Sequence, residues 1–201
     1  MTQQRQIKKF WQVLLYTLVI LGGVFAYQAF LDKKPPARGY PGIGGDFTLQ
    51  SINGPVSLKD YRGKVVVLYF GYTSCPDVCP TSLGMLSLAL RKMTSRELDN
   101  LQVFFISVDP ERDTLQRLRD YAKAFHSNIM GITGSAHEIA EVAARYKVLY
   151  KKVEMPGSAL GYSVDHSSIY YVLDRNGVLQ KLIYHGTPVD KIVSDLREVL
   201  N

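Results

Sequence analysis

An α/β fold is predicted by three features of this 201-residue sequence. Continuous runs of β-branched and aromatic residues at 64–72 and 101–109 are typical of strands buried on both faces of a sheet. Helical patterns separate these runs, and strand–helix alternation favours parallel pairing of the strands. The hydrophobic fraction of 46% and the charged fraction of 21% are those of an ordinary globular protein, so disorder is excluded.

Turn dipeptides and apolar spacing mark the other elements. Two short strands flank Asn53-Gly54 near the start of the domain, and a hairpin turns at Asn176-Gly177 near its end. A further short strand is expected at residues 129–133. Helices are expected at residues 80–93, 110–125, 135–148 and 187–200.

Each helix after the first has a predicted cap. The second is expected to begin at Pro110 with Asp109 as its N-cap. In the third, Ser135 and Glu138 have the spacing of a capping box. Thr187 is expected to cap the last helix.

The predicted element order is β-β-β-α-β-α-β-α-β-β-α, with the only two cysteines between a buried strand and the helix that follows it. This junction lies at the carboxyl end of the sheet, where α/β proteins gather their functional sites. The combination predicts a thioredoxin-like fold with an extra N-terminal β-hairpin, preceded by one transmembrane helix.

Positive charge is concentrated at the N-terminus. Residues 1–38 have six Lys/Arg and one acidic residue, whereas residues 39–201 have 18 Lys/Arg and 17 acidic residues. Because a nucleic-acid binder normally has its basic patch on the folded domain, no nucleic-acid partner is predicted.

An uncharged run at residues 10–31 is long enough to cross a hydrocarbon core of roughly 30 Å. A retained anchor is preferred over a cleaved signal peptide, because the run exceeds a usual signal core. The expected organisation is a cytoplasmic tail at residues 1–9, a transmembrane anchor at 10–31, a Pro- and Gly-rich linker at 32–45 and the folded domain at 46–201. No Arg- and Ser-rich transit sequence precedes the anchor, which favours the inner membrane of a bacterium, crossed once, with the C-terminal domain in the periplasm.

Cys75 and Cys79 are each followed by proline in the segment FGYTSCPDVCPTSL. Proline disfavours the α region for the residue before it, so neither cysteine is expected inside a helix. Cys79 is instead expected at or near the N-cap of a helix that begins at Pro80, where the helix dipole favours a thiolate.

Two uses fit this cysteine pair, a disulfide and a pair of thiolate ligands. A purely structural bridge would close a very short loop and gain little chain entropy. Redox exchange is a stronger rival, although thioredoxin-type enzymes have two residues between their cysteines rather than three. As ligands, two thiolates suit a soft metal such as copper, with zinc as the borderline alternative.

His166 is the candidate third ligand. It lies where a long polar loop meets a buried strand, beside Asp165, whose carboxylate could orient the imidazole ring. A loop-capping histidine is the alternative interpretation. The other histidines, His126, His137 and His185, are expected on the surface or in a turn.

The segments YTSCPDVCPTSL, VDPERDT and VDHSSIYYVLD, in this order, resemble the motifs of the Sco/SenC family. These are membrane-anchored copper proteins needed for assembly of cytochrome c oxidase, and the resemblance covers about residues 40–200. It implies that Cys75, Cys79 and His166 bind copper, as Cu(I) or Cu(II). Asp109 matches a family motif too, but an N-cap explains it equally well, so it is not predicted as a ligand.

The resemblance implies a metallochaperone rather than an enzyme. Its expected partner is the copper-receiving subunit of cytochrome c oxidase, to which it would deliver copper or whose cysteines it would reduce at the binuclear copper site. Other periplasmic copper chaperones or thiol reductants are further expected partners. A periplasmic thiol-disulfide oxidoreductase with copper incidental is the alternative. A peroxiredoxin-like peroxidase is more distant, since Thr73 and Cys75 only loosely match a peroxidatic loop.

Overall fold

The structure is a computed structural model that describes residues 16–17, 20–23, 39–158 and 160–201. The chain divides into two compact units, Met1–Arg38 and Gly39–Asn201. The predicted tail at residues 1–9 lies outside the described residues, and so does most of the predicted anchor. Within the described part of the chain, no helix is long and apolar enough to cross a bilayer.

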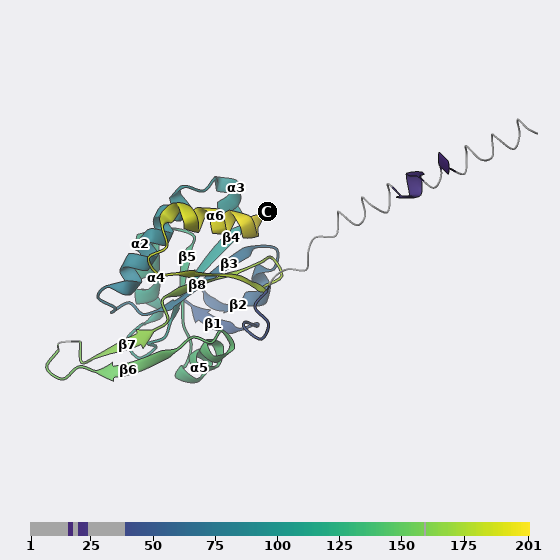
Figure 1. Ribbon diagram of the computed structural model, residues 1–201. Helices are drawn as coiled ribbons and strands as arrows, with labels where there is room; N and C mark the ends of the chain where they lie inside the picture. The colour runs from purple at the N-terminus through teal and green to yellow at the C-terminus, as the bar shows by residue number, and fades with distance from the viewer. Residues whose placement is uncertain (1–15, 18–19, 24–38, 159) are drawn as a thin grey trace, which may run out of the picture. The chain divides into compact units, whose positions relative to one another are not determined.

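A five-stranded sheet forms the centre of the second unit (Figure 1). Its strand order is β5-β4-β3-β8-β9, with β3, β4 and β5 parallel and the β8–β9 hairpin antiparallel. The predicted parallel pairing with an antiparallel edge hairpin is therefore confirmed. The strands are β3 (Val65–Gly71), β4 (Leu101–Ser107), β5 (Ile129–Ile132), β8 (Ile169–Leu173) and β9 (Leu179–Tyr184).

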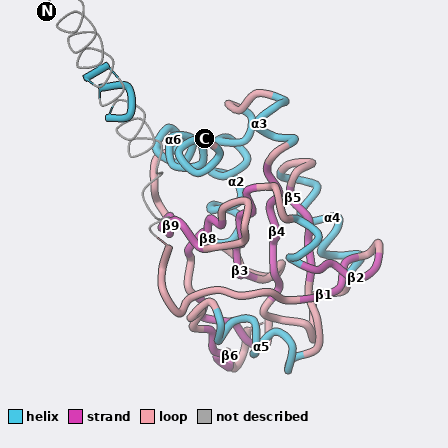
Figure 2. The backbone as a smooth tube through the Cα atoms, turned by 90° about the vertical axis from the view of Figure 1, so that its right-hand side faces the viewer, coloured by secondary structure: helices cyan, strands magenta, loops and turns pink. Residues whose placement is uncertain are grey.

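Helices cover both sides of this sheet. Figures 1 and 2 show α2 and α6 on one side and α5 on the other. The interface is apolar, because all seven residues of β3 are buried and the buried positions of α2 face them. The helical elements are η1 (Leu58–Tyr61), a 3₁₀ turn, and the α-helices α2 (Val78–Arg91), α3 (Ser95–Asp99), α4 (Leu115–Phe125), α5 (Ala136–Arg145) and α6 (Val189–Leu200).

The predicted N-terminal hairpin is confirmed as β1 (Thr48–Ser51) and β2 (Gly54–Ser57), an antiparallel pair. The predicted capping box of α5 is also confirmed, since Ser135 and Glu138 bond reciprocally. The short helix α3 was not predicted, although Thr94 and Glu97 form a second capping box at its start.

The start of α2 differs from the prediction. The helix begins at Val78, so Cys79 is its second residue and lies inside the first turn. Asp77, not Cys79, occupies the N-cap position. Pro80 is tolerated at the third position because the first four N–H groups of a helix have no partner within it. The proline therefore does not exclude Cys79 from the helix.

Two predicted caps are wrong. Helix α4 begins at Leu115, and Thr114 caps it by accepting from the Arg117 N–H. Asp109 is not an N-cap, because its buried carboxylate has tertiary partners instead. Helix α6 begins one residue later than expected, with Pro188 at the cap position, so Thr187 does not cap it.

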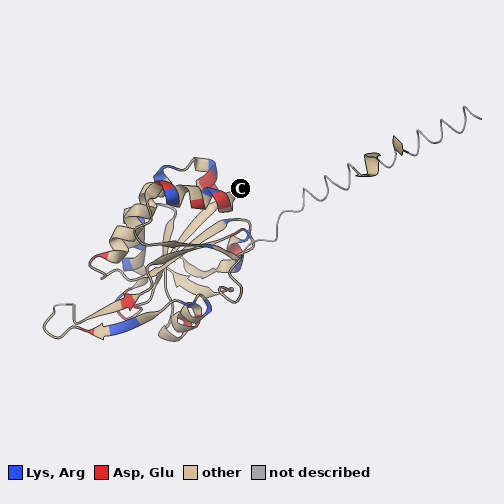
Figure 3. Cartoon of the chain, viewed as in Figure 1, with Lys and Arg blue, Asp and Glu red and all other residues tan. Residues whose placement is uncertain are grey.

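A hairpin replaces part of the predicted polar loop before the last strands. Its strands, β6 (Tyr150–Glu154) and β7 (Tyr162–His166), pair antiparallel in a sheet of their own. Four of the five β6 residues are exposed, and Figure 3 shows basic residues on this strand. Because β6 has no buried face of its own, it lacks the apolar alternation by which strands are recognised. His166, the last residue of β7, is thus placed by a hairpin.

Candidate metal centre

Three elements bring one potential ligand each to a common point. Cys75 lies in the loop after β3, Cys79 lies in the first turn of α2, and His166 ends β7. Their two sulfurs and one imidazole nitrogen all lie within 4.8 Å of one another. The Cys79 Sγ and the His166 Nε2 are 3.2 Å apart. Among the described residues, no other group of three or more His, Cys, Asp or Glu side chains is arranged to hold a metal ion.

The cysteine loop is fixed by Asp113, a buried carboxylate in the VDPERDT segment. One of its oxygens accepts from the Thr73 backbone N–H at 3.0 Å and from the Ser107 hydroxyl at 2.6 Å. The other accepts from the Thr73 hydroxyl at 2.5 Å. Because Thr73 is two residues before Cys75, these bonds hold the start of the loop against the end of β4. Sequence reasoning missed this role of Asp113, and no local pattern indicates it.

Cys79 is completely buried against β3, where Gly71 leaves it room. A Cβ atom at Gly71 would lie 2.6 Å from the Cys79 Sγ and 2.9 Å from the Phe105 ring. Real carbon atoms do not approach this closely, so a side chain at position 71 would displace the sulfur. Cys75, by contrast, is only half-buried. The pair therefore has one sheltered and one accessible sulfur.

The two thiols differ in acidity. A hydrogen bond from the Cys79 thiol lowers the pKa of Cys75 to about 3, although burial opposes the shift, and His166 contributes in the same direction. The same hydrogen bond, together with burial, raises the pKa of Cys79. The two pKa values shift in opposite directions, so Cys75 is the thiol that ionises first in the metal-free reduced pair.

The ring of His166 is oriented by a backbone carbonyl. Its Nδ1 lies 3.3 Å from the Ser167 oxygen, so Nδ1–H donates there and Nε2 is directed toward Cys79. The rings of Tyr69 and Tyr72 pack edge-on to the imidazole, with centroids 6.2 and 5.9 Å away. Asp165 does not orient the ring as expected, because adjacent residues of a strand point to opposite faces.

This chain matches the family model SCO1/SenC over residues 35–201. It belongs to the SCO1/SenC family. Among curated relatives of this family, an SCO2-like protein from Rickettsia felis is 34% identical over 195 residues, covering 92% of this chain and 95% of the relative. The mitochondrial SCO1 homolog 1 of Arabidopsis thaliana is 44% identical over 171 residues, covering 83% of this chain and 51% of the relative. The resemblance drawn from the sequence is thereby confirmed.

Solved SCO1/SenC structures share the fold. The copper-bound ScoI of Arabidopsis thaliana superposes with a TM-score of 0.72 at 40% identity, covering 78% of this chain and 98% of that one. The copper-bound ScoI of Bradyrhizobium japonicum gives 0.70 at 39% identity, covering 78% and 99%. BsSco is a member of the Sco family of cytochrome c oxidase assembly proteins, and a disulfide switch has been identified in it. Its structure superposes with a TM-score of 0.64 at 26% identity, covering 84% of this chain and 98% of that one. The predicted thioredoxin-like α/β fold agrees with these SCO1/SenC structures.

The other three histidines lie outside the three-residue group of this SCO1/SenC protein. His126 follows α4, where its Nδ1 accepts from the Asn128 N–H at 3.1 Å. His137 is exposed on α5, with its Nε2 3.5 Å from a carboxylate oxygen of Glu141. His185 lies 2.9 Å from the Ser82 hydroxyl through its Nδ1. The exposed positions of His137 and His185 agree with the predicted surface and turn roles, whereas His126 is half-buried at the end of α4.

Proposed function

We propose that this protein binds one copper ion through Cys75, Cys79 and His166 and delivers it to the binuclear copper site of cytochrome c oxidase during assembly. The convergence of two sulfurs and one imidazole nitrogen within 4.8 Å is the observation that carries the proposal. Thiolates select Cu(I), and imidazole suits copper in both oxidation states. The copper-bound structures of related proteins support this choice of metal.

The three ligands differ in acidity and in burial, and these differences affect both copper binding and copper transfer. Cys75 offers a thiolate that is already formed, whereas Cys79 must lose its proton, so binding releases protons and weakens at low pH. Cys79 is fully buried, while Cys75 and His166 are half-buried. Ligands of an incoming partner would therefore replace Cys75 and His166 first, and the buried Cys79 last.

Thiol chemistry is the second candidate function, because both cysteines are free and adjacent. The Cys75 thiolate would attack a disulfide of the receiving subunit, and the Cys79 thiol would then release the mixed disulfide. Two electrons pass to the partner, and a Cys75–Cys79 disulfide remains. The partner's two thiols take one proton from Cys79 and the other from solvent, because Cys75 reacts as a thiolate. Since that disulfide removes both thiolates, copper binding and the oxidised state exclude each other. The disulfide switch described for BsSco supports this second role.

We also propose the membrane organisation suggested by the sequence. Residues 1–9 would be cytoplasmic, residues 10–31 would anchor the protein in the bacterial inner membrane, residues 32–45 would be a linker, and residues 46–201 would face the periplasm. The uncharged run at 10–31 supports this arrangement. A SCO1/SenC family lipoprotein from Bacillus anthracis, 26% identical, is a related protein whose description also implies membrane attachment.

Substitution of each cysteine tests the copper proposal. Cys75→Ala and Cys79→Ala, each reduced, loaded with Cu(I) and desalted, are expected to lose stoichiometric copper because one sulfur and one imidazole cannot hold it tightly. His137→Ala is the matched control, since His137 is exposed on α5 outside the group. Retention of one copper per chain by either cysteine variant would contradict the proposal.

A further inference from the structure

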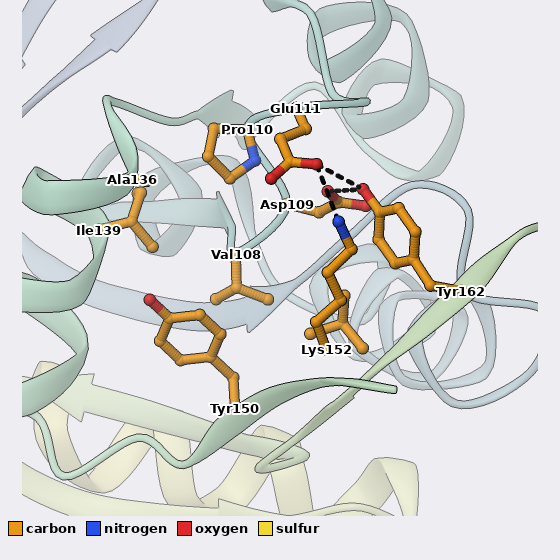
Figure 4. A pocket seen from close by; sticks show the side chains of 10 residues that line it. Val108, Asp109, Pro110, Glu111, Ala136, Ile139, Tyr150, Lys152 and Tyr162 are labelled. Carbon is orange, nitrogen blue, oxygen red and sulfur yellow. Dashed lines mark hydrogen bonds and ion pairs between the residues drawn. The ribbon is translucent and has the colours of Figure 1, made fainter. Parts of the chain in front are cut away.

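The hairpin that supplies His166 is only loosely packed on the rest of the domain. Its described residues form a two-stranded sheet separate from the five central strands, and β6 is mostly exposed. A cavity of about 160 Å³ lies beneath it, between Tyr150 and Val164 on the hairpin and Val108 after β4 (Figure 4). Apolar packing under the hairpin is therefore incomplete although Val164 is buried, and polar contacts contribute to fixing the position of the hairpin.

Arg112, in the VDPERDT segment, makes the bonds that tie the hairpin down. Its Nη1 donates to the carbonyl oxygens of Leu160 and Tyr162, at 3.1 and 2.9 Å. Its guanidinium carbon lies 3.6 Å from the centre of the Tyr162 ring, a cation–π contact. Its Nε donates to Asp109 at 2.5 Å. One side chain thus bridges the loop after β4 and the start of β7.

Three further contacts complete this attachment, between residues that Figure 4 shows. The Tyr162 hydroxyl donates to Asp109 at 2.8 Å. Lys152 donates to Glu111 at 3.0 Å, and its ammonium nitrogen lies 3.8 Å from the Tyr162 ring centre. We call these residues the clasp, which consists of Asp109, Glu111, Arg112, Lys152 and Tyr162.

The clasp can control the position of His166 through β7. Tyr162 and His166 are the first and last residues of this five-residue strand and face the same side, because the side-chain period is two. Between them, the Val164 N–H donates to the Tyr72 hydroxyl at 3.3 Å. The Tyr72 carbonyl in turn accepts from the Cys75 N–H. A shift at Tyr162 is therefore passed along a short rigid strand to the edge of the cysteine loop.

Burial makes the clasp costly to break. The Asp109 side chain is 4% exposed and that of Arg112 is 20% exposed. Removing the guanidinium would leave a buried carboxylate without its cation, which is strongly unfavourable. Among the residues that the structure describes, the buried Arg112 Nη2 has no hydrogen-bond partner, and it belongs to the guanidinium that lies over the Tyr162 ring. The guanidinium of Arg112 is therefore the group that the buried Asp109 carboxylate and the two hairpin carbonyls share.

We propose that Arg112 is a positioning residue that, through the clasp, places His166 within bonding distance of copper held by Cys75 and Cys79. The inference rests on the proposed copper site and goes beyond it, because it assigns a role to the VDPERDT segment that neither the ligand set nor a helix cap explains. It also implies that the position of His166 depends chiefly on the clasp, whereas Asp113 holds the start of the cysteine loop.

The test compares Arg112→Ala with His166→Ala in the full-length protein. Arg112→Ala is expected to weaken Cu(I) binding by about 10- to 100-fold, as loss of an outer hydrogen-bonding partner does at metal sites. It should also remove the imidazole nitrogen coupling from the Cu(II) electron paramagnetic resonance spectrum. The rate of Cys75–Cys79 disulfide formation should change much less than the copper affinity, because Asp113 holds the start of the cysteine loop and the clasp reaches that loop through Tyr72.

A double-mutant cycle separates positioning from general loss of stability. Arg112→Ala added to His166→Ala is expected to cause no further loss of copper affinity, because the residue that Arg112 places is already gone. The matched control is Arg197→Ala, which removes an arginine bonded to Glu97 and the Lys92 carbonyl and should leave copper binding unchanged. Thermal unfolding of every variant establishes that it is folded.

Two milder variants keep the inference testable if Arg112→Ala does not fold. Arg112→Lys retains a cation for Asp109 without the fork that reaches both carbonyls, and Tyr162→Phe retains the ring but loses the hydroxyl. Both are expected to give intermediate losses of affinity and of nitrogen coupling. Full nitrogen coupling and affinity in the folded variants, or additive losses in the cycle, would overturn the role of Arg112 alone. Failure of the unaltered protein to bind copper would overturn the proposed function and this inference together.

Discussion

The Nε2 of His166 lies 3.2 Å from the Sγ of Cys79, although 87 residues separate the two in sequence. The first residue ends a hairpin strand and the second lies in the first turn of a helix. The hairpin forms a sheet of its own, separate from the central sheet on which the helix packs. The contact between His166 and Cys79 therefore depends on how the hairpin and the cysteine loop are each held in place. The two anchors are Asp113, for the cysteine loop, and the clasp, for the hairpin.

Removal of the imidazole should weaken copper binding without abolishing it. His166→Ala leaves both sulfurs, which suit Cu(I), but loses the ligand that best accommodates Cu(II). We expect retained Cu(I) of lower affinity and a changed Cu(II) absorption spectrum, measured by chelator competition and visible spectroscopy. His185→Ala serves as the control histidine. An affinity and spectrum identical to the unaltered protein would show that His166 is not a ligand.

The low pKa of Cys75 predicts unusual reactivity in the metal-free reduced protein. A thiol whose pKa lies at about 3 is a thiolate throughout the range from pH 5 to 8. Alkylation by iodoacetamide should therefore proceed at nearly the same rate across this range, whereas an ordinary thiol slows about tenfold for each pH unit below about 8.5. Mass spectrometry identifies the modified residue and its rate.

The partner of that thiolate can be tested in the same assay. Cys79→Ala removes the thiol that donates to Cys75, so the pKa of Cys75 should rise and its alkylation should slow at pH 5. A rate for Cys75 that already falls tenfold per pH unit in the unaltered protein would contradict the assigned thiolate.

Gly71 should tolerate no side chain. In Gly71→Ala, the added methyl group meets the buried Cys79 sulfur and the Phe105 ring, and overpacking of this kind costs about 1–3 kcal/mol. Urea denaturation measures the loss in unfolding free energy, and copper affinity should fall as the sulfur is displaced. Gly84→Ala is the matched control, because no described residue outside its own helical turn lies within 4 Å of the added carbon and alanine favours the helix interior. Equal effects of the two substitutions would contradict the close packing at Gly71.

Asp113 should matter for stability and for the cysteine loop. Asp113→Ala leaves the Thr73 N–H and the Ser107 hydroxyl without their acceptor, at a cost of about 3 kcal/mol. Urea denaturation should show that loss, whereas Asp120→Ala, at an exposed carboxylate on α4, should change the unfolding free energy by less than about 1 kcal/mol. A small effect at position 113 would mean that the loop is held in another way.

Local sequence patterns predicted the local structure well. The apolar run at 64–72 became a fully buried strand, and Ser135 with Glu138 became a capping box. The two cysteines and His166 were selected by residue chemistry and by the family resemblance, and the structure brings all three together. These features depend on neighbours in sequence or on motif spacing, which the sequence displays directly.

Features that depend on distant residues were not predictable in this way. Asp109 has the local pattern of a helix cap. Its carboxylate instead accepts a hydrogen bond from the Tyr162 hydroxyl, 53 residues away, as part of the clasp. The hairpin was missed because β6 is exposed and has no apolar face to indicate a strand. Both errors concern one region, the attachment of His166, where tertiary contacts override local preferences.

Copper stoichiometry together with X-ray absorption, on the full-length protein prepared fully reduced and fully oxidised, tests the copper site most directly. We predict one copper per reduced chain with sulfur and imidazole nitrogen as its neighbours, and no copper in the oxidised protein, because a Cys75–Cys79 disulfide removes both thiolates. A reduced protein that retains no copper, or an oxidised protein that retains as much, would contradict the account. The first outcome would leave thiol–disulfide exchange as the function of the cysteine pair.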